Sequence, residues 1–308
     1  MLKLVFMGTP EFAVPSLEAL CQAGYPILAV VTGSDKPRGR GQRLSPTPVK
    51  QSALRHAIPV LEPPSVKDPA FAEQILRLGP DLAVVVAFRI LPPSVFTIPR
   101  LGTFNLHASL LPRYRGAAPI HWAIMNGETE TGVTTFFLEQ AVDTGALLLQ
   151  SRVSIEPEDD AGTLHDRLAG VGARIVLDTV RMIERGEAKP RPQDNGEATP
   201  APKIFKEQCR ILWNRPAEQL QNFVRGLAPH PAAWTMHGGH LLKIYRTRSM
   251  KGGQPGVPGV VTVTDTSLMV AAQDGHVEIL ELQQEGRRRM TAKEFLRGYS
   301  LTTGDHWS

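Results

Sequence analysis

The stretch Asp81-Leu82-Ala83-Val84-Val85-Val86-Ala87-Phe88 decides the fold class. An unbroken run of apolar, largely β-branched residues predicts a strand that is covered on both faces, as in a parallel sheet. The run from Leu82 to Phe88 has seven residues, whereas about 20 are required to span a bilayer. We therefore expect an interior strand of an α/β protein.

Shorter apolar runs on both sides extend this strand into a sheet. The predicted strands are residues 2–7, 27–31, 81–88, 103–107, 133–138 and 146–155, and the predicted helices are residues 12–21, 49–56, 69–78, 120–125 and 163–184. Alternating strands and helices predict a doubly wound, mainly parallel, Rossmann-like sheet with helices on both faces. The closely spaced last two strands are expected to add antiparallel edges.

The composition changes after this region. Residues 186–203 contain four prolines and few apolar residues, which is typical of an extended linker. A predicted helix at 217–227 is followed by short alternating stretches, a pattern that indicates a small OB-like β-barrel. We expect a catalytic domain of residues 1–185, a linker of residues 186–204 and a C-terminal domain of residues 205–308.

The net charge of +4 is concentrated in the last third of the chain, where residues 206–308 hold 13 Lys and Arg against 9 Asp and Glu. This excess favours an anionic partner for the C-terminal domain. Cys21 and Cys209 have neither metal-ligand nor redox spacing and are expected to be reduced, buried thiols. With no membrane-spanning run and no signal-peptide pattern, a cytoplasmic monomer without an obligate protein partner or membrane contact is expected.

Several common chemistries have no support in the sequence. Gly8-Thr9-Pro10 follows the first predicted strand but lacks the spacing of a dinucleotide-binding fingerprint. The chain has no phosphate-loop motif, and its His, Cys, Asp and Glu residues show no zinc-site spacing. The sequence therefore predicts no resident metal or nucleotide cofactor.

Two polar residues at the end of a short strand are the best candidates for chemistry. Asn105 and His107 alternate with Phe104 and Leu106, so both polar side chains are expected on one face of the strand. An amide and an imidazole there could donate to a developing oxyanion. Taken alone, the pair is more often two satisfied polar residues at a strand end.

A carboxylate follows the next strand, in Asp143-Thr144-Gly145. An Asp at this position often only stabilises a turn. It could also orient His107 or accept a proton from an attacking amine.

Together these motifs resemble those of the 10-formyltetrahydrofolate-dependent formyltransferases. That family shares an Asn-x-His strand end, a Ser-Leu-Leu-Pro turn, here residues 109–112, and a distal Asp-Thr-Gly loop on a doubly wound sheet. The resemblance implies that Asn105, His107 and Asp143 are catalytic and that 10-formyltetrahydrofolate is a cosubstrate rather than a tightly bound cofactor. It further implies folate-binding residues, namely Ser109, Leu110, Leu111 and Pro112 in the turn and Val86, Ala87, Phe88, Ala141 and Val142 around the pterin.

One segment departs from the family pattern. After Ala87 the family usually carries a Tyr-Gly-containing segment before Leu-Pro, but here the chain reads Phe88-Arg89-Ile90-Leu91-Pro92 and is one residue shorter. The pterin contacts near residues 88–90 are therefore expected to differ, while the catalytic trio is intact.

Further motifs resemble the branch of this family that formylates initiator methionyl-tRNA. They are the opening Gly8-Thr9-Pro10-Glu11, the extension Arg113-Tyr114-Arg115-Gly116 of the folate turn, and a basic loop at residues 34–50. The loop carries the expected tRNA-binding residues Lys36, Arg38, Arg40, Arg43 and Lys50. Independently of the family, five cations beside flexible glycines favour contact with phosphates.

Three other functions stay open at the sequence level. A formyltransferase acting on a nucleotide-linked amino sugar would keep the fold and change only the acceptor. A folate hydrolase would use the same trio to release formate to water. A non-catalytic RNA-binding module would have lost folate binding altogether.

Overall fold

The computed structural model of the chain describes residues 1–38, 43–252, 256–264 and 267–308. They form two compact units, the first made of residues 1–116, 131–153 and 165–200 and the second of residues 117–130, 154–164 and 201–308. This division differs from the expected continuous domains. Two inserts from the catalytic half of the sequence group with the C-terminal unit, and most of the expected linker groups with the first unit.

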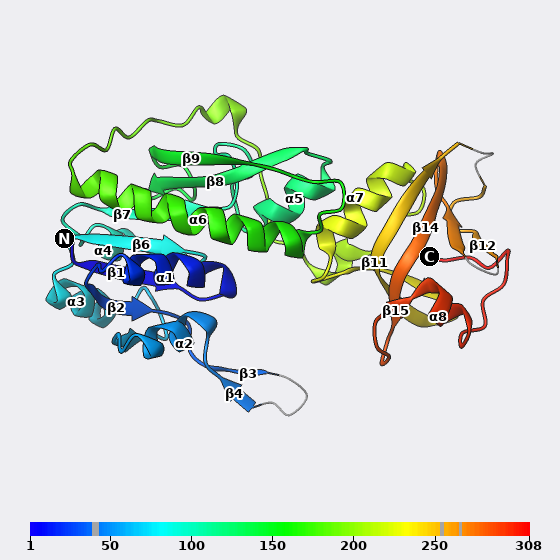
Figure 1. Cartoon of the computed structure of the whole chain (residues 1–308), viewed down its shortest axis with the longest axis horizontal. Helices are drawn as coiled ribbons and strands as arrows, with labels where there is room; N and C mark the ends of the chain where they lie inside the picture. Colours follow the sequence, from blue (N-terminus) through cyan, green and yellow to red (C-terminus); the bar gives the residue numbers. More distant parts are fainter. Residues whose placement is uncertain (39–42, 253–255, 265–266) are drawn as a thin grey trace. The chain divides into compact units, whose positions relative to one another are not determined.

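The first unit contains the predicted doubly wound sheet. Within the described residues its seven strands have the order β5-β2-β1-β6-β7-β8-β9 (Figure 1). The strands from β5 to β7 are parallel, whereas β8 pairs antiparallel with β7. The bounds are β1 (Leu4–Gly8), β2 (Ile27–Val31), β5 (Val60–Leu61), β6 (Leu82–Val86), β7 (Thr103–His107), β8 (Glu130–Phe137) and β9 (Leu147–Ser154). The mainly parallel sheet expected from the sequence is confirmed.

Helices cover both faces of this sheet (Figure 1). Val5 and Met7 of β1 belong to an apolar cluster with residues of the helices on one face. On the other face, a Cβ added at Gly172 would lie 2.6 Å from a methyl group of Leu106 in β7, so the long helix there packs closely on the strand. The helices of this unit are η1 (Glu11–Ala13), α1 (Val14–Gln22), α2 (Pro48–Arg55), α3 (Pro69–Leu78), α4 (Pro93–Phe96), most of α6 (Ala161–Glu184) and η2 (Asn195–Glu197).

Local sequence signals set the ends of these helices. Asp68 caps α3 by accepting a hydrogen bond from the Ala70 N–H at 3.0 Å, and Pro69 occupies the first turn. The helix ends at Gly79, whose φ of 58° lies in the left-handed region that glycine adopts readily.

The second unit is built on an antiparallel sheet with the order β10-β11-β14-β13-β12 and with β15 beside β14. Its strands are β10 (Ala233–His237), β11 (His240–Lys251), β12 (Val261–Val263), β13 (Leu268–Ala271), β14 (Gly275–Gln284) and β15 (Met290–Thr291). Its helices are α5 (Pro119–Met125), η3 (Lys206–Cys209), α7 (Ala217–Leu227) and α8 (Ala292–Leu296). The C-terminal domain of short β-strands expected from the sequence is confirmed, and its sheet is antiparallel.

The last residues of the described chain link the two ends of this sheet. Val261 N–H donates to the Asp305 carbonyl at 2.8 Å beside β12, and Met236 N–H in β10 donates to the Ser308 carbonyl at 2.8 Å. The same segment seats Trp307, which is fully buried in the apolar core of the unit. The antiparallel sheet is thereby curled towards a barrel.

The described helices include none with an apolar stretch that could cross a membrane, not even the 24-residue α6.

Candidate active site

The imidazole of His107 is fixed at the carboxyl end of β7. Its side chain is only 7% exposed, and Nε2 lies 2.8 Å from the carbonyl oxygen of Tyr114. A carbonyl can only accept a hydrogen bond, so Nε2 carries a proton. The other ring nitrogen, Nδ1, faces Asp143.

Asp143 approaches His107 from the loop between β8 and β9, residues 138–146, here called the Asp143 loop. Asp143 Oδ2 accepts a hydrogen bond from the Gly116 N–H at 2.9 Å and lies 3.7 Å from His107 Nδ1. The backbone of Asp143 has a φ of 56°, and that of Gly116 has a φ of 125°. The 3.7 Å separation exceeds a hydrogen bond, so proton exchange requires these groups to move closer or to share a bridging atom.

Asn105 lies two residues before His107 on the same face of β7, opposite to Leu106 and therefore away from α6. Its half-buried amide makes no hydrogen bond to any residue in the described ranges, so its donors are open to a ligand. The structure thus brings His107 and Asp143 together and presents Asn105 beside them. The arrangement suits the stabilisation of a negative charge on an oxygen atom.

The expected folate turn is held by a hydroxyl group that the sequence did not single out. Thr134 Oγ1, on β8 directly opposite His107, donates to the Ser109 carbonyl at 2.6 Å and accepts from the Leu111 N–H at 3.2 Å. Ser109 Oγ donates to the Arg113 carbonyl at 2.6 Å. Ser109 and Leu111 are buried, and the Leu111–Pro112 peptide is cis. Thr134 is one of three threonines in β8, and nothing in the sequence distinguishes it for this role.

The residues expected around the pterin differ in how far they are exposed. Ala87, Ala141 and Val142 are exposed, and Ala87 has a φ of 47°. Val86 is buried at the end of β6, and Phe88 packs against the apolar cluster beneath the sheet. Phe88 lies in the segment that departs from the family pattern, and its partly buried side chain packs on the core.

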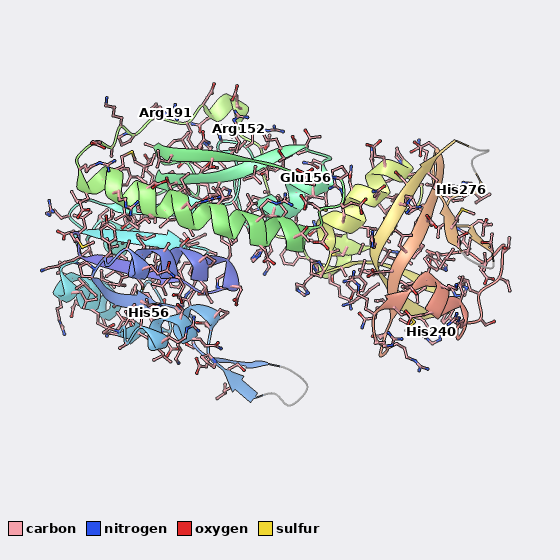
Figure 2. All side chains as sticks on the ribbon, viewed as in Figure 1. His56, Arg152, Glu156, Arg191, His240 and His276 are labelled. Atoms are coloured by element: carbon pink, nitrogen blue, oxygen red, sulfur yellow. The ribbon has the colours of Figure 1, made fainter. Side chains whose placement is uncertain are left out.

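The expected linker is anchored to the first unit. Residues 187–200, here called the strap, pair with β9 where Arg191 N–H donates to the Leu147 carbonyl at 2.9 Å and Leu147 N–H returns a bond of 2.7 Å. Figure 2 shows Arg191 on the strap and Arg152 on β9. Thr199 accepts the Tyr114 N–H at its hydroxyl group and the Arg115 N–H at its carbonyl. The composition of this segment gives no sign of these pairings.

The basic loop forms a separate two-stranded sheet of β3 (Lys36–Arg38) and β4 (Arg43–Ser45) (Figure 1). Lys36 and Arg38 lie on β3 and Arg43 on β4, and the register pairs Arg38 with Arg43. Arg40 lies outside the described residues.

Lys50 differs from the expectation of a phosphate-binding side chain. It lies in α2, where Nζ donates to Asp35 at 2.8 Å and to Glu62 at 2.7 Å. Hydrogen bonds to Asp35 and Glu62 raise the pKa of the ammonium group. The charge of Lys50 is already compensated by two carboxylates, which leaves it less suited to bind a phosphate. Because Asp35 directly precedes β3, the contact instead ties the start of the β3–β4 hairpin to α2. Sequence spacing does not reveal partners from two distant segments.

Both cysteines are free thiols; Cys209 is buried as expected, whereas Cys21 is only partly buried. Burial and the Glu18 carboxylate raise the pKa of Cys21 to about 11, and burial raises the pKa of Cys209. Thiols with raised pKa values are poor nucleophiles at neutral pH. Within the described ranges, no three His, Cys, Asp or Glu side chains are grouped closely enough to hold a metal ion.

Family models match both halves of the chain. The model described as Formyl transferase matches residues 2–180, and that described as Formyl transferase, C-terminal domain, matches residues 203–300. The chain is 47% identical over 311 residues to a methionyl-tRNA formyltransferase of Bacteroides fragilis, covering 98% of this chain and 96% of that protein. It is 50% identical over 304 residues to the protein of the same name from Chlorobium luteolum, covering 97% of each.

Solved structures share the fold at low sequence identity. An N-formyltransferase from Helicobacter canadensis, in complex with folinic acid and dTDP-3-aminofucose, has a TM-score of 0.69 at 19% identity and is covered to 100%, with 94% of this chain. HypX from Aquifex aeolicus in complex with tetrahydrofolic acid has a TM-score of 0.65 at 18% identity, over 100% of this chain and 51% of HypX. With both domain models matched and relatives nearly half identical over almost the full length, this chain belongs to the formyl transferase family and, within it, to the methionyl-tRNA formyltransferases.

Proposed function

We propose that Asn105, His107 and Asp143 carry out the transfer of the formyl group of 10-formyltetrahydrofolate to the α-amino group of initiator methionyl-tRNA. The observation that supports these roles most strongly is the approach of Asp143 Oδ2 to within 3.7 Å of His107 Nδ1. The Tyr114 carbonyl occupies the other ring nitrogen, so Nδ1 is the nitrogen available for chemistry.

The reaction begins when the lone pair of the methionyl amine attacks the formyl carbon. The formyl oxygen then becomes an oxyanion, which the Asn105 amide and a protonated His107 stabilise by donating hydrogen bonds. The intermediate collapses by cleavage of the bond between the formyl carbon and N10. No covalent bond to the enzyme forms, so catalysis depends on positioning and electrostatics.

One proton must move for the reaction to balance, because the attacking amine loses a proton and N10 gains one. The Asp143 carboxylate is placed to accept the amine proton, directly or through a bridging water, and to pass it on towards N10. Asp143 Oδ2 accepts from the Gly116 N–H, whereas Oδ1 accepts no hydrogen bond from the described residues.

The turn at Ser109, Leu110, Leu111 and Pro112 is proposed to bind the folate, with Val86, Ala87, Phe88, Ala141 and Val142 beside the pterin. The β3–β4 hairpin is proposed to contact the tRNA through Lys36, Arg38, Arg40 and Arg43, supported by Lys50. We further propose that the enzyme is a cytoplasmic monomer that needs no protein partner. A single species of monomer mass in light scattering, with full activity of the purified chain, would support that part.

The roles of the trio are tested by formylation assays of Asn105→Ala, His107→Ala and Asp143→Asn. Removing one oxyanion donor costs about 10²–10³ in kcat in other enzymes, and we expect losses of that order. His165→Gln is the matched control, because His165 lies on α6 and contacts Phe12 and Asp166 rather than the trio. Near-normal kcat in a folded Asn105 or His107 variant would reject the assignment.

The acceptor is tested in the same assay with elongator methionyl-tRNA, a nucleotide-linked amino sugar, and no tRNA. Selective formylation of the initiator is expected. Formate release without tRNA would instead indicate a hydrolase, and formylation of the sugar would indicate the other acceptor class.

A further inference from the structure

The side chain of Gln193 on the strap binds the Asp143 loop with one end of its amide group and Arg115 with the other. Gln193 Nε2 donates to the carbonyl of Asp143 at 2.9 Å and to the carbonyl of Gly145 at 2.8 Å. Gln193 Oε1 accepts from Arg115 Nε at 3.1 Å and from Arg115 Nη2 at 2.6 Å. Both donors and the acceptor of the amide are therefore occupied.

These bonds act on a strained part of the backbone. Asp143 has a φ of 56°, in the left-handed region that is strained for a residue other than glycine. Two carbonyls that bracket Thr144 are held by one side chain, which restrains the turn on both sides. The loop is closely packed as well, because a Cβ at Gly145 would collide with the Phe137 carbonyl oxygen.

The same amide connects the two backbone segments that meet at Asp143. Arg115 precedes Gly116, whose N–H donates to Asp143 Oδ2 at 2.9 Å. Gln193 holds the Arg115 guanidinium through both Nε and Nη2. This one residue of the strap thus fixes the carboxylate through its own loop and through the segment that donates to it.

We propose that Gln193 is a positioning residue that holds Asp143 at its working distance from His107, so that the strap is part of the catalytic apparatus rather than a passive linker. The proposal rests on the role assigned to Asp143 under the proposed function. Gln193 contacts the backbone of the loop and acts only through Asp143.

The test compares two substitutions that remove an amide NH₂ group at neighbouring positions of the strap. Gln193→Glu keeps an acceptor for Arg115 but removes both donors and faces two carbonyl oxygens with a carboxylate. Asn195→Asp is the matched control, because Asn195 uses only its oxygen on Arg115 and the aspartate retains that acceptor. Steady-state formylation is measured at saturating initiator tRNA and folate, and thermal unfolding reports folding.

We expect Gln193→Glu to lower kcat about 10–100-fold, the range found when a residue supporting a functional group is changed in other enzymes. KM for initiator tRNA should stay within about twofold, because binding does not depend on the carboxylate position. Asn195→Asp should keep kcat within about twofold. Gln193→Met, which also lacks the donors but adds no charge, replaces Gln193→Glu if the latter unfolds, and should lower kcat in the same direction.

A double-mutant cycle with Asp143→Asn separates positioning from a general weakening of the fold. If Gln193 acts through Asp143, adding Gln193→Glu to Asp143→Asn lowers kcat by less than about twofold further. Losses that multiply, equal losses in Asn195→Asp, or wild-type kcat in Gln193→Glu would overturn the proposal. Near-normal kcat in Asp143→Asn alone would overturn the proposed function instead, so the two failures are distinguishable.

Discussion

At the scale of single residues, the site depends on side chains that satisfy backbone groups as much as on the trio itself. The Tyr114 carbonyl selects the tautomer of His107, and the Gly116 N–H fixes Asp143 Oδ2. Thr134 holds the turn that follows His107 and is fully buried. Each of these contacts turns a flexible polar group into one of fixed orientation, which reduces the reorganisation required during catalysis.

Thr134 provides a sharp prediction at this scale. Thr134→Val keeps the shape but removes the hydroxyl, which leaves the buried Ser109 carbonyl and Leu111 N–H without this partner. We expect a loss of about 1–3 kcal/mol of unfolding free energy and a reduced kcat, measured by urea unfolding and formylation. The control is Thr131→Val on the same strand, since the Thr131 hydroxyl is buried without a hydrogen bond in the described residues and its removal should be neutral or stabilising. Equal losses in both variants would contradict this account.

At the scale of elements, polar contacts between helices support the hairpin that carries the basic residues. Helices α1 and α2 are linked through Glu18, whose carboxylate accepts from Ser52 at 2.6 Å and from Arg55 at 3.0 Å and contacts His56 at 2.7 Å. Lys50, also in α2, binds Asp35 before β3 and Glu62 after β5. The hairpin therefore starts from a base that is tied to two other elements.

The Glu18 link predicts a pH-dependent stability. Burial alone would raise the pKa of Glu18, but hydrogen bonds from Ser52, His56 and Arg55 outweigh it and hold the pKa at about 2, below the ordinary 4.5. The carboxylate thus stabilises the fold above pH 4.5, and this contribution is lost as the pH falls towards 2. Glu18→Gln should cost about 1 kcal/mol at pH 5, since the group is partly solvated. Thermal unfolding of both proteins from pH 5 to pH 2 should show the difference shrinking; a constant difference would argue against it.

The Lys50 link predicts an effect on one substrate only. Lys50→Met removes the cation that joins Asp35 to Glu62, so the hairpin base should loosen and KM for initiator tRNA should rise several-fold, with KM for the folate unchanged. Lys67→Met is the control for loss of one positive charge, because Lys67 is exposed and lies before α3. A matching rise in the control would mean that net charge, rather than the clamp, is responsible.

At the scale of the whole molecule, the two units do not follow the order of the sequence. Each unit includes a segment that a division of the chain into two continuous domains would give to the other unit. The strap completes the first unit, and α5, from the middle of the chain, belongs to the second. There His121 Nδ1 lies 2.7 Å from the Gly226 carbonyl in α7. The C-terminal segment completes the antiparallel sheet through its bonds to β10 and to the start of β12.

The closing segment predicts how the second unit loses stability. Trp307 is fully buried in its core, so Trp307→Ala should destabilise this unit by about 3–5 kcal/mol. Val257→Ala is the control, since Val257 is 68% exposed and its truncation should change stability by less than about 0.5 kcal/mol. The stability of both variants is measured by denaturant unfolding. Backbone circular dichroism serves as the signal, because it does not depend on the substituted tryptophan. A Trp307 variant as stable as the wild type would show that the segment does not hold the unit together.

The sequence by itself determined the elements with a strong local signal. The buried run around Val84, the helix at residues 69–78, the alternating C-terminal strands and the motifs at Asn105, His107 and Asp143 could all be read along the chain, because periodicity and short motifs depend on neighbouring residues. Only the tertiary structure decided the rest. It placed Asp143 beside His107, paired Lys50 with two carboxylates, brought Thr134 against the turn at residues 109–112 and made the strap part of the first unit. These contacts join residues far apart in sequence through single polar groups, and a lone Thr, Gln or Lys carries no pattern that identifies its partner.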